Sequence, residues 1–164
     1  MNRLEGKVAI VTGGAQGMGA SHATRFVNEG AKVIITDINE EAGKALEKSL
    51  GKDAKFIKQD VTKKEDWDKV VKAANDTFGQ IDILVNNAGI SVNKPMMEMT
   101  EEDYRRIVDI NQVSVFLGTQ AVVPTMTELG KGSIVNVSSI NGLVGGAVGY
   151  TDTKFAVRGF TKAA

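Results

Sequence analysis

The sequence contains no cysteine and only one histidine, His22, among its 164 residues. The absence of cysteine excludes disulfide bonds, cysteine zinc sites and thiol nucleophiles. One histidine is too few for the usual histidine-based metal centre, so we expect no bound metal. The chemistry of this chain must therefore come from other residue types.

A surplus of charge of one sign and long apolar runs are also lacking. Lys and Arg together number 20, as do Asp and Glu, so no basic surplus marks a nucleic-acid-binding surface. No apolar run approaches the length of a membrane span, and the N-terminal residues are too polar for a signal peptide. We therefore expect a soluble, cytoplasmic protein that binds neither nucleic acid nor membrane.

Short apolar segments alternate along the chain with segments of helical spacing. We expect strands at 7–12, 32–37, 54–61, 81–87 and 132–139. Helices are expected at 17–29, 39–50, 62–78, 100–128 and from about 149. This alternation predicts a single α/β domain over residues 1–164, with a doubly wound parallel sheet covered by helices on both faces.

Three of the expected helices carry recognisable start signals. Asn39 is a plausible N-cap, and Thr62 with Glu65 forms the T-x-x-E pattern of a capping box. Thr100 and Asp103 open the next helix in the same way.

Four glycines lie between the first strand and the first helix, in the sequence TGGAQGMG (12–19). Glycine at this density costs conformational entropy, so a tight turn, close helix–strand packing or a ligand lying on bare backbone must account for it. Free N–H groups and the positive end of a helix dipole favour a phosphate at such a position. The spacing of Gly13, Gly17 and Gly19 is G-x-x-x-G-x-G rather than the commoner G-x-G-x-x-G, and by itself it is weak evidence.

Asp37 strengthens the dinucleotide interpretation. It ends the second strand, 24 positions after Gly13 (37 − 13), close to the roughly 20 expected for a carboxylate that binds an adenosine ribose. Such a carboxylate repels a 2′-phosphate, and the glycine loop holds no Arg, its variable positions being Gln16 and Met18. We therefore expect NAD rather than NADP. The competing interpretation is that Asp37 only caps the following helix.

A second group of polar residues lies in the last third of the chain. Tyr150 and Lys154 are spaced i, i+4, so a helix places them on one face. A nearby ammonium favours the phenolate, which would make Tyr150 a proton donor or acceptor. Ser138 and Ser139 end the last strand, at the edge of the sheet where open α/β folds bind ligands.

Taken together, these motifs resemble the short-chain dehydrogenase/reductase family. The matching segments follow the family's order through the whole chain: TGGAQGMG (12–19), Asp60-Val61, NNAG (86–89), DINQVSVFLG around Asn111, NVSS (136–139) and YTDTK (150–154). Within the family, the sequence looks most similar to NAD-dependent hydroxysteroid and secondary-alcohol dehydrogenases.

The resemblance implies a Rossmann fold of strand order 3-2-1-4-5 and an NAD site. It assigns Asp37 to the adenosine ribose and Asp60 to the adenine amino group, with Val61 beside the ring. The residues expected to bind NAD are Gly13, Gln16, Gly17, Met18, Gly19, Asp37, Ile38, Asp60, Val61, Asn87, Ala88, Gly89, Tyr150 and Lys154.

The resemblance also implies a catalytic tetrad of Asn111, Ser139, Tyr150 and Lys154. Ser139 is chosen over Ser138 because S-I-N-G (139–142) fits the family's S-x-x-G. Tyr150 would take the proton of a secondary alcohol as hydride passes to the nicotinamide, and Ser139 would bond the substrate oxygen. Lys154 would lower the pKa of Tyr150 and hold the nicotinamide ribose, and Asn111 would position a water. The expected substrate is a secondary alcohol or its ketone, such as a hydroxysteroid or a cyclic alcohol.

The sequence departs from the family pattern in two places. The segment between Ser139 and Tyr150 is slightly shorter than usual, and family members continue with two further strands and a substrate-covering region that this sequence lacks. We therefore expect residues 1–164 alone to be inactive and prone to association, and the longer protein to be a homo-oligomer, a tetramer or a dimer.

Two other functions fit the same motifs. One is a dinucleotide-binding fragment without activity. The other is a 3-oxoacyl carrier-protein reductase, against which Asp37 argues because such enzymes commonly prefer NADP.

Overall fold

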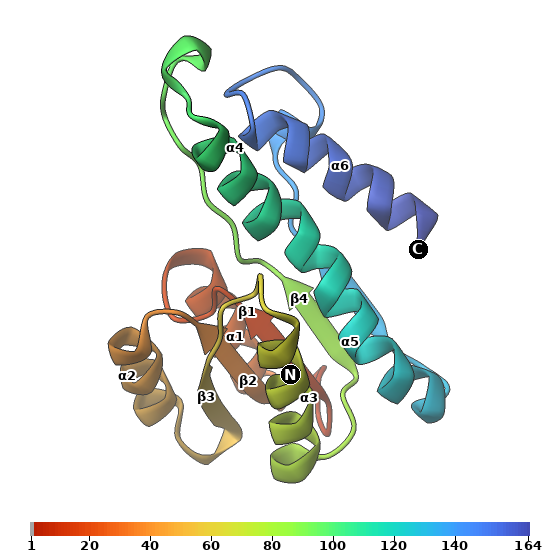
Figure 1. Ribbon diagram of the computed structural model, residues 1–164. Helices are drawn as coiled ribbons and strands as arrows, with labels where there is room; N and C mark the ends of the chain where they lie inside the picture. The colour runs from red at the N-terminus through yellow and green to blue at the C-terminus, as the bar shows by residue number, and fades with distance from the viewer. Residues whose placement is uncertain (1) are drawn as a thin grey trace.

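Five parallel strands form one sheet at the centre of the molecule. The structure is a computed structural model that describes residues 2–164. The sheet order is β3-β2-β1-β4-β5, which confirms the predicted order (Figure 1). The strands are β1 (Val8–Thr12), β2 (Lys32–Asp37), β3 (Ala54–Lys58), β4 (Ile83–Asn86) and β5 (Ser133–Asn136).

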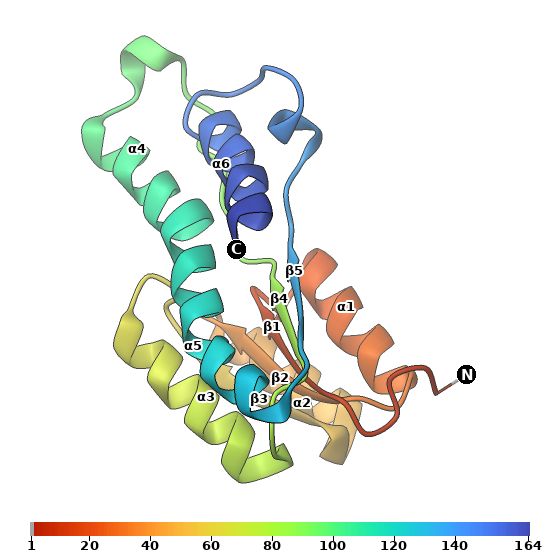
Figure 2. The ribbon, with the colours of Figure 1, turned by 90° about the vertical axis from the view of Figure 1, so that its right-hand side faces the viewer.

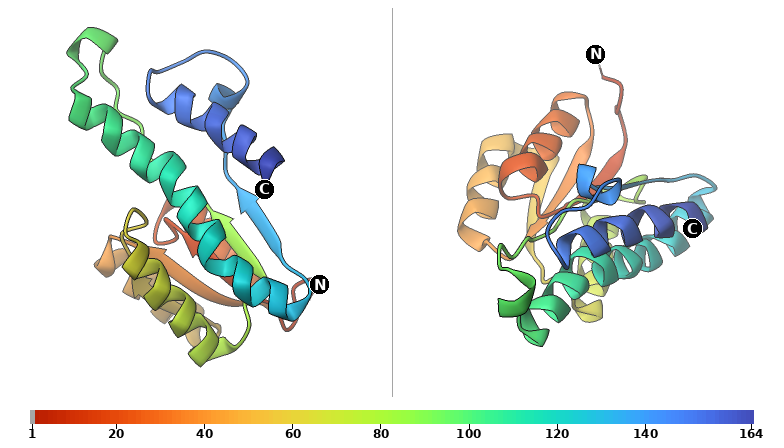
Figure 3. Two further views of the ribbon diagram at one scale, coloured as in Figure 1. Left: turned by 45° about the vertical axis from the view of Figure 1, so that its right-hand side comes forward. Right: turned by 90° about the horizontal axis from the view of Figure 1, so that it is seen from above.

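Helices cover both faces of this sheet, as expected for a doubly wound fold. Helices α1 (Gly17–Asn28) and α2 (Glu40–Leu50) pack on one face. The other face carries α3 (Lys64–Phe78) and α5 (Ser114–Leu129). Figure 2 shows α1 on one side of the strands and α3 with α5 on the other. Helices α4 (Glu101–Val108) and α6 (Tyr150–Ala163) lie side by side beyond the carboxyl end of the sheet (Figure 3).

The two-sided burial follows from the alternation of side chains along each strand. In β1, Val11 contacts the core under α1 and α2, whereas its neighbour Ile10 contacts the core under α3 and α5. In β2, Ile35 and Ile34 divide in the same way. Every residue of β1 is buried, and the strand pairs with β2 and β4, so the glycine loop that follows it leaves from the interior of the sheet.

Trp67 fixes the packing of α3 against α5. Its ring is buried, and its Nε1 donates a hydrogen bond to the carbonyl of Val61 at 2.9 Å. Gly118 on α5 faces the ring, where an added Cβ would lie 2.5 Å from Trp67 Cη2. The absence of a side chain at 118 therefore lets the two helices approach closely.

Three strands are shorter than the sequence predicts. Pairing in β3, β4 and β5 stops at Lys58, Asn86 and Asn136, whereas the predicted strands ran to 61, 87 and 139. The chain leaves the sheet shortly after these points to form the loops of its carboxyl edge, and at β4 a side chain from the neighbouring strand takes over a backbone group. The N–H of Asn87 donates to Thr12 Oγ1 at 3.0 Å.

The predicted capping box of Thr62 and Glu65 is wrong. Helix α3 begins at Lys64, and no side chain caps it. The hydroxyl of Thr62 instead donates to Asp60 Oδ1 at 2.7 Å, so it is used by the preceding turn.

The other two predicted helix starts are confirmed. Asn39 Oδ1 accepts the N–H of Ala42 at 3.1 Å. Thr100 and Asp103 make both bonds of a capping box at the start of α4, each at 3.1 Å.

The expected continuous helix over 100–128 is interrupted by a π-helical turn, η3 (Asp109–Val113), between α4 and α5. Asn111 lies within it, and its amide bonds both backbone groups of Ile90, accepting the N–H at 2.8 Å and donating to the carbonyl at 2.9 Å. Such turns hold one extra residue in a helix and are frequent at functional sites. Apolar spacing does not reveal this turn, because the bonds that accompany it come from a loop 21 residues away.

Candidate functional site

The glycine loop brings bare backbone against the start of α1. A Cβ added at Gly19 would lie 2.1 Å from the carbonyl oxygen of Gly13, and one added at Gly13 would lie 2.9 Å from Ala88 Cα. The side chain of Asn87 secures the same contact by donating to the carbonyls of Thr12 and Gly13, at 2.9 and 3.1 Å. The loop therefore needs glycine for close approach.

The N-terminus of α1 is open toward the adjoining space. No side chain caps the helix, and its first turn contains no acidic residue. Gly17 has a positive φ of 52°, and an added Cβ there would meet nothing within 4 Å. Uncapped N–H groups and the positive helix end form a site for a phosphate or diphosphate.

A cavity of about 650 Å³ lies in front of this helix end. It has the size of an ordinary ligand pocket. All the residues predicted for NAD, apart from Tyr150 and Lys154, line it together with five that the sequence analysis missed. Those five are Asn39, Gln59, Ile90, Arg106 and Ile110.

Asp37 lines this cavity and also binds backbone groups of neighbouring lining segments. Its two carboxylate oxygens accept the N–H groups of Ala15 at 3.1 Å and Asn39 at 3.0 Å. It therefore holds the glycine loop against the end of β2, as well as supporting the start of α2. A carboxylate can accept about four hydrogen bonds, so capacity remains for the hydroxyls of a ribose.

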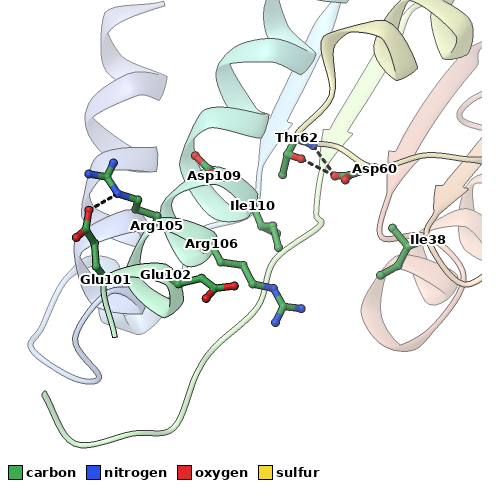
Figure 4. A pocket seen from close by; sticks show the side chains of 9 residues that line it. All are labelled: Ile38, Asp60, Thr62, Glu101, Glu102, Arg105, Arg106, Asp109 and Ile110. Atoms are coloured by element: carbon green, nitrogen blue, oxygen red, sulfur yellow. Dashed lines mark hydrogen bonds and ion pairs between the residues drawn. The ribbon is translucent and has the colours of Figure 1, made fainter. Parts of the chain in front are cut away.

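A second hollow of about 690 Å³ adjoins the first, between the turn after β3 and helix α4. Figure 4 shows its lining side chains: Ile38, Asp60, Thr62, Glu101, Glu102, Arg105, Arg106, Asp109 and Ile110. Four of these, Ile38, Asp60, Arg106 and Ile110, also line the first cavity. The two spaces therefore meet at the end remote from α1.

Lys154 lies at the junction of the cavity with α6. Its Nζ donates to the carbonyl of Val137 at 2.8 Å and lies 5.5 Å from the centroid of the Tyr150 ring. A Cβ added at Gly89, which lines the cavity, would lie 3.6 Å from this Nζ. Burial lowers the pKa of Lys154 below its ordinary value of 10.5.

The two serines of the predicted site have different surroundings. The hydroxyl of Ser138 donates to the carbonyl of Lys154 at 2.9 Å and is used in packing. Ser139 Oγ accepts the N–H of Asn141 at 3.2 Å, which leaves its proton available as a donor. Asn141 Nδ2 in turn lies 3.4 Å from Thr151 Oγ1, next to Tyr150.

Asn111 is buried and linked to Tyr150 through one residue. Besides its bonds to Ile90, its Nδ2 donates to Thr153 Oγ1 at 3.2 Å, and that hydroxyl donates to the carbonyl of Tyr150 at 2.8 Å. The structure thus connects η3 to the first turn of α6. The role of Asn111 in positioning a water stays a prediction.

Other kinds of site find little support. Within residues 2–164, no three His, Asp or Glu side chains gather in a way that could hold a metal ion. In the same part of the chain, no helix combines the length and apolarity needed to cross a membrane.

Comparison with known proteins identifies the family of this chain. The family described as short chain dehydrogenase matches residues 7–164. The chain is 50% identical over 162 residues to a 3-alpha-(or 20-beta)-hydroxysteroid dehydrogenase of Mycobacterium bovis, covering 98% of this chain and 62% of that protein.

Two relatives from Comamonas testosteroni are similar over the same region. A cyclopentanol dehydrogenase is 47% identical over 168 residues, covering 99% of this chain and 67% of the relative. A 3-beta-hydroxysteroid dehydrogenase is 42% identical over 165 residues, covering 99% and 65%. This chain thus spans between 62% and 67% of the length of these relatives.

Proposed function

The chain belongs to the short-chain dehydrogenase family, and on this premise we propose that the protein is an NAD(H)-dependent oxidoreductase that interconverts a secondary alcohol and a ketone. The observation that carries the proposal is the position of Lys154. This buried cation lies beside the Tyr150 ring and against Gly89, where the cavity of the glycine loop meets α6. The pair that we propose for proton transfer therefore lies next to Gly89, one of the residues that line the cavity.

The residues present fit a dinucleotide. The uncapped start of α1 suits a diphosphate, and Gly13 and Gly19 leave no side chain in the way. Asp37 suits a free ribose and would repel a 2′-phosphate, which supports NAD over NADP. When bound, the nicotinamide would supply hydride acceptance and donation, and the protein would supply orientation and electrostatics.

The chain's own residues would handle the proton. In the oxidative direction, the phenolic oxygen of Tyr150 would take the hydroxyl proton of the alcohol. The Lys154 ammonium beside the ring would stabilise the phenolate, and the Ser139 hydroxyl would keep its proton and donate a hydrogen bond to the substrate oxygen. Thr153 and Asn111 would hold the first turn of α6 in place.

The relatives suggest the substrate class. Their names include two hydroxysteroid dehydrogenases and a cyclopentanol dehydrogenase. Each of these named substrates contains a ring, although a 20-beta-hydroxyl is on the side chain of the steroid rather than on a ring. We therefore propose a secondary alcohol of a ring-containing compound, with hydroxysteroids and cyclopentanol as the first compounds to assay in the whole protein.

Replacing Tyr150 by Phe tests the proposal, and the second tyrosine of the chain, Tyr104, offers a matched control. Tyr150→Phe keeps the ring beside Lys154 and removes the transferable proton. We expect kcat to fall by about 10²–10⁴-fold, with the Kd for NADH within about twofold of the unmutated value. Tyr104→Phe should keep most of the activity. Substantial turnover by Tyr150→Phe would refute the acid–base assignment.

A further inference from the structure

The end of the cavity remote from α1 has apolar walls. Ile38 is exposed over 69% of its surface, an unusual state for a large aliphatic side chain at the edge of a buried strand. Val61 and Ile110 line the same end. Three aliphatic side chains around an open space suit a flat heterocyclic ring better than a phosphate.

Only three charged side chains line this cavity: Asp37, Asp60 and Arg106. Both carboxylates have defined hydrogen-bond partners. Asp37 accepts two backbone N–H groups, and Asp60 Oδ1 accepts the N–H and hydroxyl of Thr62 at 2.9 and 2.7 Å. Arg106 is thus the one cation among the described residues that borders the space.

Arg106 and its neighbour Arg105 differ in how they are held. Arg105 Nε donates to Glu101 Oε1 at 2.7 Å and is part of an ion pair on the surface of α4. The side chain of Arg106 makes no hydrogen bond or ion pair within residues 2–164. Figure 4 shows Arg105 turned toward Glu101, whereas Arg106 extends the other way, to the side on which Ile38 lies.

Helix geometry explains why Arg106 reaches this place. Arg106 and Ile110 are spaced i, i+4, so they lie on the same side of the α4–η3 segment, and both line the two adjoining hollows. The capping box at Thr100 fixes the start of this helix, and the bonds of Asn111 to Ile90 fix its end. The guanidinium is therefore carried on a helix held at both ends.

We propose that Arg106 is a cofactor-binding residue whose guanidinium stacks on the exposed face of the adenine base, between the walls formed by Ile38 and Ile110. This inference rests on the proposed function and adds a base-recognition residue to it. A guanidinium is planar, weakly hydrated and suited to stacking on an aromatic face. An unpaired Arg at the rim of an apolar slot can do so without breaking an existing bond.

The test separates stacking on the base from attraction to the phosphates. Adenosine, 5′-AMP, nicotinamide mononucleotide and NADH are titrated into the whole protein and into Arg106→Ala, Arg106→Lys and Arg105→Ala. Adenosine carries the base without a phosphate, and nicotinamide mononucleotide carries a phosphate without adenine. Arg105→Ala is the matched control, because it removes an identical side chain one position away.

We expect Arg106→Ala to raise the Kd for adenosine, 5′-AMP and NADH by about five- to tenfold and to leave that for nicotinamide mononucleotide unchanged. Arg106→Lys should raise the Kd for adenosine about as much as Arg106→Ala does, because lysine keeps the positive charge but lacks the planar guanidinium group. Arg105→Ala should change the Kd of every probe by less than about twofold.

Two results would overturn the inference while the proposed function stands. One is an equal effect of Arg106→Ala and Arg105→Ala in a protein that still oxidises alcohols with NAD. The other is a loss restricted to the phosphate-bearing probes and restored by Arg106→Lys, which would show a charge effect alone. If the unmutated protein binds neither NADH nor 5′-AMP, the proposed function fails and this inference fails with it.

Discussion

At the scale of single residues, Asp37 has a structural role in addition to the cofactor selectivity proposed for it. Its oxygens hold the N–H groups of Ala15 and Asn39, so its removal should loosen the loop as well as alter cofactor choice. Asp37→Asn is the sharper change, because an amide keeps one acceptor and loses the charge that repels a 2′-phosphate. We expect its ratio of NADPH to NADH affinity to rise about tenfold, measured by fluorescence titration.

Asp37→Ala serves as the comparison for that experiment. Asp37→Ala should also reduce the preference for NADH over NADPH, and it should lower the melting temperature more than Asp37→Asn does. Equal affinity of the unmutated protein for NADH and NADPH would contradict the proposed selectivity.

Lys154 shows a conflict between function and stability. Because burial lowers its pKa, the ammonium is less favourable in the folded protein than in the unfolded chain. Lys154→Met keeps the aliphatic stem, so we expect loss of turnover together with a melting temperature higher by about 2–4 °C at neutral pH.

The pH dependence of this gain has a definite sign. As pH rises from the lowered pKa toward the ordinary value of 10.5, the folded protein gives up the proton before the unfolded chain does, and the unmutated protein gains stability. The advantage of Lys154→Met should therefore shrink over that range in a series of thermal melts. Lys162→Met, at an exposed position on the same helix, should change the melting temperature little at neutral pH. A constant difference at all pH values would refute the explanation by burial.

Sequence spacing was sufficient for the residues of the glycine loop and for Asp37, because strand–loop–helix order alone puts them at one edge of the sheet. It was insufficient to place Arg106 at the cavity, because that position depends on the direction in which α4 leaves the same edge. Gln59 was also missed. It is buried in the wall of the cavity with both amide atoms lacking a partner among the described residues, and nothing in a strand-like run of residues signals this.

At the scale of secondary-structure elements, the threonines that precede α3 and α4 can be compared, because both were predicted to cap a helix. Thr100 caps α4 through its hydroxyl, whereas Thr62 uses its hydroxyl for Asp60. Thr100→Ala should lower the free energy of unfolding by about 1 kcal/mol, measured by urea denaturation. Thr62→Ala should lower it less and weaken adenosine binding, because the turn that holds Asp60 is loosened. The reverse pattern would mean that Thr62 is the cap after all.

This difference in hydrogen-bond partners explains why the capping box predicted at Thr100 is correct and the one predicted at Thr62 is wrong. Both segments have a Thr followed three residues later by an acid, but Asp60 lies just before Thr62 and offers a nearer acceptor. The predicted strands were too long because their last residues belong to the loops at the carboxyl edge of the sheet. The π-helical turn at Asn111 depends on a distant partner, so no local pattern could reveal it.

At the scale of the whole molecule, Glu29 ties the chain's start to the end of α1. Hydrogen bonds from the backbone N–H and the guanidinium of Arg3, at 3.2 and 3.1 Å, lower the pKa of Glu29 to about 2 from 4.5. A carboxyl with a lowered pKa adds stability that is present above 4.5 and is lost as pH falls through 2. Glu29→Gln should therefore melt lower than the unmutated protein at pH 7, and the two should converge near pH 2.

Glu128→Gln is the control for this series. Glu128 is exposed on α5 and forms no ion pair within the described residues. Its replacement should leave the melting temperature at pH 7 within about 1 °C of the unmutated value. A Glu29→Gln deficit that persisted at pH 2 would show that charge is not the source of the stabilisation.

The position of β1 in the sheet has a kinetic consequence for exchange of amide hydrogens with solvent. Its residues pair with β2 on one side and β4 on the other, and all of them are buried. Their amides can exchange only when the sheet opens as a whole, so they should be the slowest in the chain. A few residues on, no side chain caps the start of α1 at Gly17, and Met18 is exposed. The boundary between slowly and rapidly exchanging amides should therefore fall within the glycine loop, and a ligand bound at α1 should move it toward the helix.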